Sequence, residues 1–101
     1  MFPSRAPAYA QAMAHVDEEI ILTRAHLALE ASAIGHAMLD GDYEEARFRA
    51  YLLHSQACDL ALDEVADAAR DVLGFMPVEG QPKTGVGRAL LRLCDAVSAT
   101  R

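Results

Sequence analysis

Two histidine–glutamate pairs near the start of the chain have a spacing that suits metal binding. His15 precedes Glu19 by four residues, and His26 precedes Glu30 by the same interval. On an α-helix this interval brings an imidazole and a carboxylate onto one face, where they can chelate a divalent ion. The two pairs are about 16 Å apart along a helix, so they cannot share one ion. A metal site would need a ligand from another helix, and the alternative is a solvated helix flank.

A second group of candidates lies in the stretch HAMLDGDYEEARFRAYLLH, residues 36–54. Tyr43, Arg47, Tyr51 and His54 fall on one side of the helix that this stretch predicts, and Arg47 and His54 are only about 20° apart around its axis. These residues can bind a phosphate or a nucleotide, or their polar ends can extend from the border of a core into solvent. No nucleophile, general base or glycine-rich phosphate loop accompanies them, so we expect binding rather than catalysis.

An acidic pattern follows in the next part of the chain, where an aspartate occupies every fourth position from Asp59 to Asp71. In a continuous helix these side chains share one face and repel each other by roughly a few tenths of a kcal/mol per pair. Arg88 and Arg92 have the matching spacing on a later predicted helix. We expect a solvated acidic face that these arginines partly neutralise, and the alternative is a docking site for a basic partner or a cation.

The composition limits the classes of function. The chain has 101 residues, of which 52% are hydrophobic, and its formal net charge is -6. This length suits one domain with a thin core. Nucleic acids and anionic membranes are bound through clustered Lys and Arg, so the charge argues against both as general partners. Nucleic acid remains an alternative only as a substrate at a small basic site, and nothing in the sequence indicates a cofactor.

The two cysteines, Cys58 and Cys94, fall among apolar residues of predicted helices. Because no C-x-x-C spacing occurs, we expect two reduced thiols that pack in the core, and the alternative is a disulfide or a metal-binding pair. The first five residues lack the charged start and apolar run of a signal peptide, and no apolar stretch is long enough to span a bilayer. These features favour a cytoplasmic location.

Glycine and proline divide the chain into three predicted helices, at about residues 8–39, 43–73 and 85–99. Apolar residues recur at helical spacing in each range, which predicts one buried face per helix. Gly41 can adopt the positive φ that ends a helix, and Asp42 can cap the next helix with Glu45 in the reciprocal position. The sequence therefore predicts an all-α fold with a long antiparallel helical hairpin and a shorter third helix.

The lengths of these helices predict a homodimer. Each helix of the hairpin is about 45 Å long, whereas the third is about 22 Å long and covers only half of the pair. Apolar residues near the turn then have too few partners, and an exposed apolar strip usually marks an interface. We expect two hairpins to complete a four-helix core across the dimer. The expected interface residues are Leu27, Ile34, Met38, Phe48, Tyr51 and Leu52.

Three short segments are Gly41-Asp42-Tyr43 at a turn, the run from Ala46 to Tyr51, and Pro82-Lys83-Thr84-Gly85 before a further helix. Together they resemble motifs of the HEPN domains, small all-α domains of prokaryotic toxin–antitoxin and nucleotide-binding proteins. The resemblance covers about residues 20–97. It implies frequent dimerisation and, in many members, ribonuclease activity that uses an Arg followed after four to six residues by a His.

Arg47 and His54 fit that ribonuclease spacing and are the candidate catalytic residues that the resemblance implies. Arg49 and His54 fit it as well, but they are about 140° apart around a continuous helix and cannot act together. The family usually places the pair nearer its last helices.

The leading hypothesis is thus a helical homodimer that binds a protein partner or a small ligand. A HEPN-like ribonuclease or nucleotide-binding protein and a divalent-metal-binding helical bundle are the two alternatives.

Overall fold

Four α-helices make up the part of the chain that the structure describes. The computed structural model describes the backbone of residues 8–100 and the side chains of residues 18–100. The helices are α1 (Ala8–Leu39), α2 (Tyr43–Asp59), α3 (Asp63–Gly74) and α4 (Val86–Ser98). No strand occurs among the described residues, so the predicted all-α class is confirmed for them.

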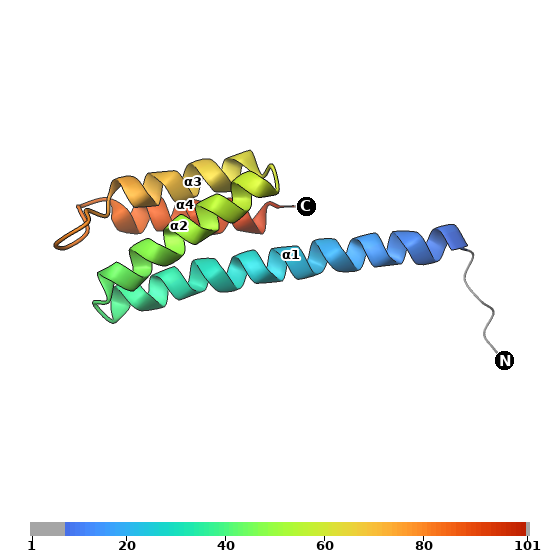
Figure 1. Cartoon of the computed structure of the whole chain (residues 1–101), viewed down its shortest axis with the longest axis horizontal. Helices are drawn as coiled ribbons and strands as arrows, with labels where there is room; N and C mark the ends of the chain where they lie inside the picture. Colours follow the sequence, from blue (N-terminus) through green and yellow to red (C-terminus); the bar gives the residue numbers. More distant parts are fainter. Residues whose placement is uncertain (1–7, 101) are drawn as a thin grey trace.

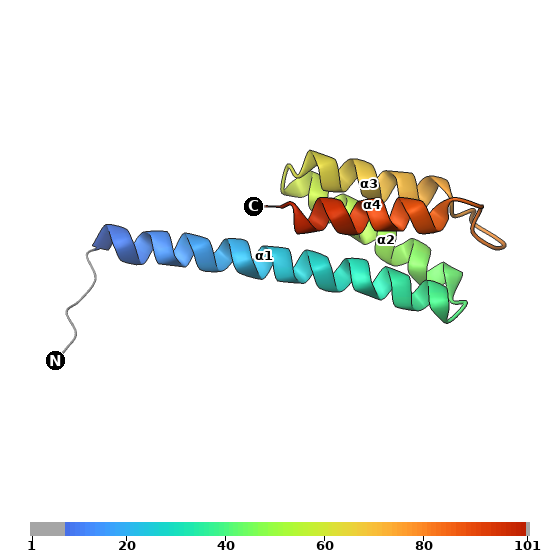
Figure 2. The same cartoon turned by 180° about the vertical axis from the view of Figure 1, so that it is seen from behind.

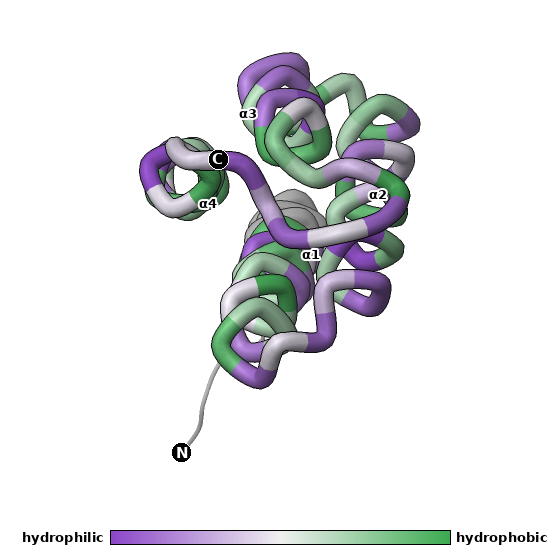
Figure 3. The backbone as a smooth tube through the Cα atoms, turned by 90° about the vertical axis from the view of Figure 1, so that its left-hand side faces the viewer, coloured by the Kyte–Doolittle hydropathy of each residue, from purple (hydrophilic) through white to green (hydrophobic). Residues whose placement is uncertain are grey.

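The helices run in alternating directions and occupy four corners of a bundle (Figures 1, 2 and 3). Each helix packs against the next one in the chain, and α4 packs back against α1. α2 crosses obliquely from the end of α1 to the start of α3, so it connects the two sides of the bundle (Figure 1). This arrangement encloses a four-helix core within one chain.

The prediction of one continuous helix over residues 43–73 is wrong, because the chain reverses direction between α2 and α3. At the break, Ala61 adopts a φ of 58°. The N–H of Leu62 donates to the carbonyl of Ala57 at 2.9 Å, and the N–H of Ala61 donates to the carbonyl of Cys58 at 3.1 Å. These two hydrogen bonds are the Schellman arrangement that ends helices.

The reversal has an energetic reason. It folds α3 back between α2 and α4, where the side chains of Val65, Ala69 and Val72 become buried. Burying an aliphatic side chain of this kind contributes about 1.5–3 kcal/mol. A straight continuation of α2 would carry these residues away from α4, so tertiary packing outweighs the local preference for an unbroken helix.

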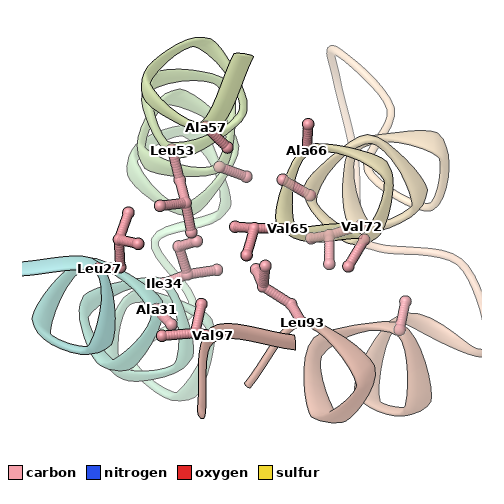
Figure 4. Packing of buried hydrophobic residues seen from close by; sticks show 14 of the residues in the cluster. Leu27, Ala31, Ile34, Leu53, Ala57, Val65, Ala66, Val72, Leu93 and Val97 are labelled. Carbon is pink, nitrogen blue, oxygen red and sulfur yellow. The ribbon is translucent and has the colours of Figure 1, made fainter. Parts of the chain in front are cut away.

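We expected two chains to form a four-helix core together, but the four helices of a single chain already form one. Leu27 and Ile34, two of the expected interface residues, are fully buried in this core together with Leu53 and Leu93. Figure 4 shows such side chains from all four helices pointing into a common interior. Leu27 and Ile34 are therefore core residues, and the described fold does not present them to a second copy.

The helix α1 is longer than the bundle that packs against it. Its 32 residues correspond to about 48 Å, whereas the 17 residues of α2 correspond to about 25 Å. Near the middle of α1, Arg24 Nη2 donates to the carbonyl of Ser98 at the end of α4, at 3.2 Å. The N-terminal part of α1 continues beyond this point without a neighbouring helix (Figures 1 and 2). None of the helices in the described residues combines the length and apolar character needed to cross a membrane.

Candidate functional site

An open groove of about 1060 Å³ lies between the first turns of α2 and the loop that joins α3 to α4. Two of the predicted binding residues, Arg47 and Tyr51, line it, and so does Phe48 from the expected dimer interface. The other lining residues are Asp42, Glu44, Glu45, Val78 and Glu79. The structure therefore brings part of the predicted site together in one groove and adds acidic and loop residues to it.

The start of α2 is held in place by its cap and by an arginine. The carboxylate of Asp42 accepts the N–H of Glu45 at 3.2 Å, as the capping pattern predicts. The reciprocal half of that pattern is replaced, because the carboxylate of Glu45 accepts Arg49 Nε at 2.6 Å. Arg49 Nη1 also lies 3.5 Å from Glu30 on α1. The hydrogen bond and charge of Glu45, with a smaller contribution from Glu30, raise the pKa of Arg49.

The loop on the other side of the groove is closed at its base. The N–H of Lys83 donates to the carbonyl of Phe75 at 2.7 Å. Gly85 has a φ of 107°, and a Cβ atom at this position would lie 2.9 Å from Cε1 of Phe75. Only glycine fits this close approach without a shift of the ring. The closed base positions Val78 and Glu79 opposite α2.

His54 does not line the groove. Its Nε2 lies 3.7 Å from the Sγ of Cys58, one turn further along α2. Arg47 and His54 are seven residues apart, which corresponds to about 10 Å along the helix. A ligand that contacts both would therefore have to span two turns of α2. Tyr43 is partly buried in the first turn and is not among the groove residues.

The cysteine prediction is wrong for Cys58, which is exposed, while Cys94 is partly buried. The break after α2 explains the difference, because it separates Cys58 from the apolar positions of α3 that would have continued its face. Both cysteines are free. Burial, and to a smaller degree the charge of Asp95, raises the pKa of the Cys94 thiol.

The predicted metal stripe is only partly described. Glu30 pairs with Arg49, and His26 is exposed on α1. The side chain of His15 lies outside the described residues. Among the side chains of residues 18–100, no group of three His, Cys, Asp or Glu residues is arranged to hold a metal ion.

The predicted acidic face is divided between two helices, because Asp59 ends α2 whereas the next three aspartates belong to α3. One of the expected neutralising contacts is present, since Arg92 lies 3.7 Å from Asp71. Asp67 instead pairs with Arg70 on its own helix at 2.9 Å. All four side chains are more than half exposed, so each pair contributes at most about 1 kcal/mol.

A further surface, which the sequence patterns did not predict, lies on the side of α1 that faces away from the core. From residue 20 to 39 the Asp, Glu, Lys or Arg residues of this helix are Arg24 and Glu30, and both contact other helices or their ends. The opposite side is exposed and carries none of these residue types. We call it the outer α1 stripe: Ile21, Leu22, Ala25, Ala28, Leu29, Ser32, His36 and Leu39. The sequence feature that could have revealed this surface is the scarcity of charged residues between positions 20 and 39.

No family model, curated protein or solved structure matches the chain.

Proposed function

We propose that the protein is a helical binding module that forms a homodimer through the outer α1 stripe. The observation that carries this proposal is the stripe itself, which is exposed along its whole length and has no Asp, Glu, Lys or Arg. A surface helix normally carries charged residues opposite the core, and a helix that is apolar all round is typically buried all round. Exposed Ile21, Leu22 and Leu29 form the kind of apolar patch that marks an interface.

A second copy of the chain suits this stripe better than a charged partner does. Each copy has a net charge of -6, but the stripe itself contains no carboxylate that would repel the stripe of a second copy. A two-fold dimer uses the same patch on both copies. In an antiparallel arrangement, Leu22 and Leu29 of one helix can pack over the small residues Ala25, Ala28 and Ser32 of the other.

This proposed dimer differs from the dimer that the sequence predicts. The dimer that the sequence predicts uses the core-facing side of α1, which includes Ile34, together with residues of α2, whereas the proposed interface uses the opposite side of α1. The four-helix core then stays intact in each copy. The proposed interface does not use the groove beside α2, because none of the residues that line the groove belongs to α1. The dimer would therefore present two grooves to its partners.

Sedimentation equilibrium on two matched variants tests the proposal. Leu29 is 70% exposed on the stripe, and Leu91 is 68% exposed on α4, outside it. We expect wild type and Leu91→Glu to be dimers at micromolar concentration, and Leu29→Glu to be a monomer with an unchanged helical circular-dichroism spectrum. A monomeric wild type would refute the proposal. Equal behaviour of the two variants would show that any dimer uses another surface.

A HEPN-like ribonuclease remains a prediction from the sequence. It would require Arg47 and His54 to act on one phosphodiester, although they lie two helical turns apart. The groove around Arg47 also contains Glu44 and Glu79, which repel phosphate. Cleavage of an RNA substrate that is lost in both Arg47→Ala and His54→Ala would support this alternative over a binding module.

A further inference from the structure

The groove beside α2 has an apolar floor that no other residue of the described part of the chain covers. Phe48 is 55% exposed, Tyr51 is 59% exposed and Val78 is 79% exposed. Phe48 and Tyr51 come from one face of α2, and Val78 comes from the loop on the other side of the groove. Large apolar side chains that gather around a hollow mark a binding surface more often than single exposed residues do.

The walls of the groove are acidic. Four carboxylates line it, and Arg47 is its one cation among the described lining residues. Two of the carboxylates have structural roles, since Asp42 caps α2 and Glu45 binds Arg49. Such roles explain acidic residues at the start of a helix without any ligand.

Glu44 and Glu79 form no ion pair with any described residue, although Glu44, in the first turn of α2, is also favoured there by the helix dipole. Glu44 stands on α2 and Glu79 on the loop, so each of the two elements that line the groove contributes one of these carboxylates. Glu79 lies in the loop between α3 and α4 and not in the first turn of a helix, so helix capping does not account for it. The apolar floor and the unpaired carboxylates beside it together define the chemistry of a complementary ligand.

The groove is also held in shape before any ligand binds. The Lys83–Phe75 hydrogen bond closes the loop, and Gly85 packs closely against the ring of Phe75. Phe75 itself packs against the core. A site that is already formed loses less conformational freedom on binding, which favours affinity.

We infer that this groove binds a cationic, amphipathic segment of a partner protein. Apolar side chains of the segment pack on Phe48, Tyr51 and Val78, and its Lys or Arg residues face Glu44 and Glu79. Phosphate-bearing ligands are disfavoured by the four carboxylates, and the open shape suits a peptide laid along the surface. The inference deepens the proposed binding role, and it does not depend on dimerisation.

Fluorescence anisotropy with a synthetic probe tests the charge requirement. The probe is a labelled peptide of Leu and Lys in helical spacing, and the same peptide with Glu in place of Lys is its negative control. We expect Glu44→Gln/Glu79→Gln to weaken binding of the Leu–Lys peptide by about tenfold or more. Glu64→Gln/Asp95→Asn removes the same charge from the α3–α4 surface and should leave the affinity nearly unchanged.

Two further measurements locate the site. Phe48→Ser should weaken binding as well, and amide NMR signals that move on titration should cluster in the first turns of α2 and around Val78. Absence of binding, equal weakening by both charge-removing variants, or shifts centred elsewhere would overturn the inference. Leu29→Glu should bind the peptide as wild type does, so a failed dimer and a failed groove give different results.

Discussion

Gly41 and Ala61 occupy equivalent positions in two turns that share one hydrogen-bonding pattern. Both have a positive φ, 76° for Gly41 and 58° for Ala61. In the first turn the N–H of Asp42 donates to the carbonyl of Ala37, as that of Leu62 donates to Ala57 in the second. The chain thus reverses direction twice through the same type of turn. Glycine adopts the required positive φ without strain in the first turn, whereas alanine is strained in the second.

The two turns predict opposite effects of exchanging glycine and alanine. A Cβ at position 41 would meet no atom within 4 Å, so the cost of Gly41→Ala is conformational. We expect Gly41→Ala to lower, and Ala61→Gly to raise, the free energy of unfolding by about 1 kcal/mol. That corresponds to roughly 4–8 °C in Tm for a domain of this size, measured at one fixed protein concentration. Destabilisation by Ala61→Gly would contradict the equivalence.

A second pair of glycines tests the closure of the loop. At Gly85 an added Cβ would approach Phe75 to 2.9 Å on a backbone with φ of 107°, whereas Gly87 in α4 has open space around it. We expect Gly85→Ala to cost about 1–3 kcal/mol. Gly87→Ala, the matched control, should gain about 0.5–1 kcal/mol because it lies in a helix. Urea titrations of the two variants measure both values, and a neutral Gly85→Ala would argue against the tight base of the loop.

The two sides of α1 should differ in their contribution to stability. Ile34 is fully buried, so Ile34→Ala should destabilise the fold by about 2–5 kcal/mol. Leu29→Ala removes an exposed side chain and should change monomer stability by less than about 0.5 kcal/mol. Both values are measured by chemical denaturation in solutions dilute enough for the protein to be monomeric. A large loss in Leu29→Ala that persists on dilution would place Leu29 in the core instead.

The two thiols should react differently with a thiol reagent. Cys58 is exposed, whereas Cys94 is partly buried and its pKa is raised, so Cys58 should be labelled first at neutral pH and Cys94 more slowly. A raised pKa means that the folded state holds the Cys94 proton more tightly than the unfolded state. This contribution to stability is complete below the pKa of the unfolded thiol and is lost as the pH rises through the higher folded value. Comparing wild type with Cys94→Ala across alkaline pH measures the loss, and parallel curves would exclude it.

The helix break at residues 60–62 shows where sequence reasoning reaches its limit. Gly41 and Asp42 predict the first turn, because glycine favours the positive φ that follows a helix and aspartate favours the N-cap of the next one. Ala61 has no such preference, and Leu62 and Val65 continue the apolar spacing of α2 across the break. Packing against α4 decides the break, and packing between distant segments is not encoded in local residue preferences.

In the candidate site, too, the features that depend on local sequence were predictable, and those that depend on packing between distant segments were not. Arg47 and Tyr51 were recognisable because they share a helix face, which depends only on helical periodicity. Val78 and Glu79 were not, because their position depends on how the loop folds back over Phe75. The outer α1 stripe was not predicted because the apolar periodicity was interpreted as one buried face per helix. On that interpretation Leu29 is an isolated exposed residue.

The order of the helices in the bundle has a consequence for folding speed. α1 packs on α2, α2 on α3 and α3 on α4, so most of the helix–helix contacts join segments that are close in the chain. Among the described helices, only the packing of α4 against α1 joins segments that are far apart in the sequence. Such a low mean sequence separation is typical of domains that fold in microseconds to milliseconds. The docking of α4 is then the step with the largest entropic cost, and substitutions at Val97 should slow folding more than substitutions of equal cost between α2 and α3.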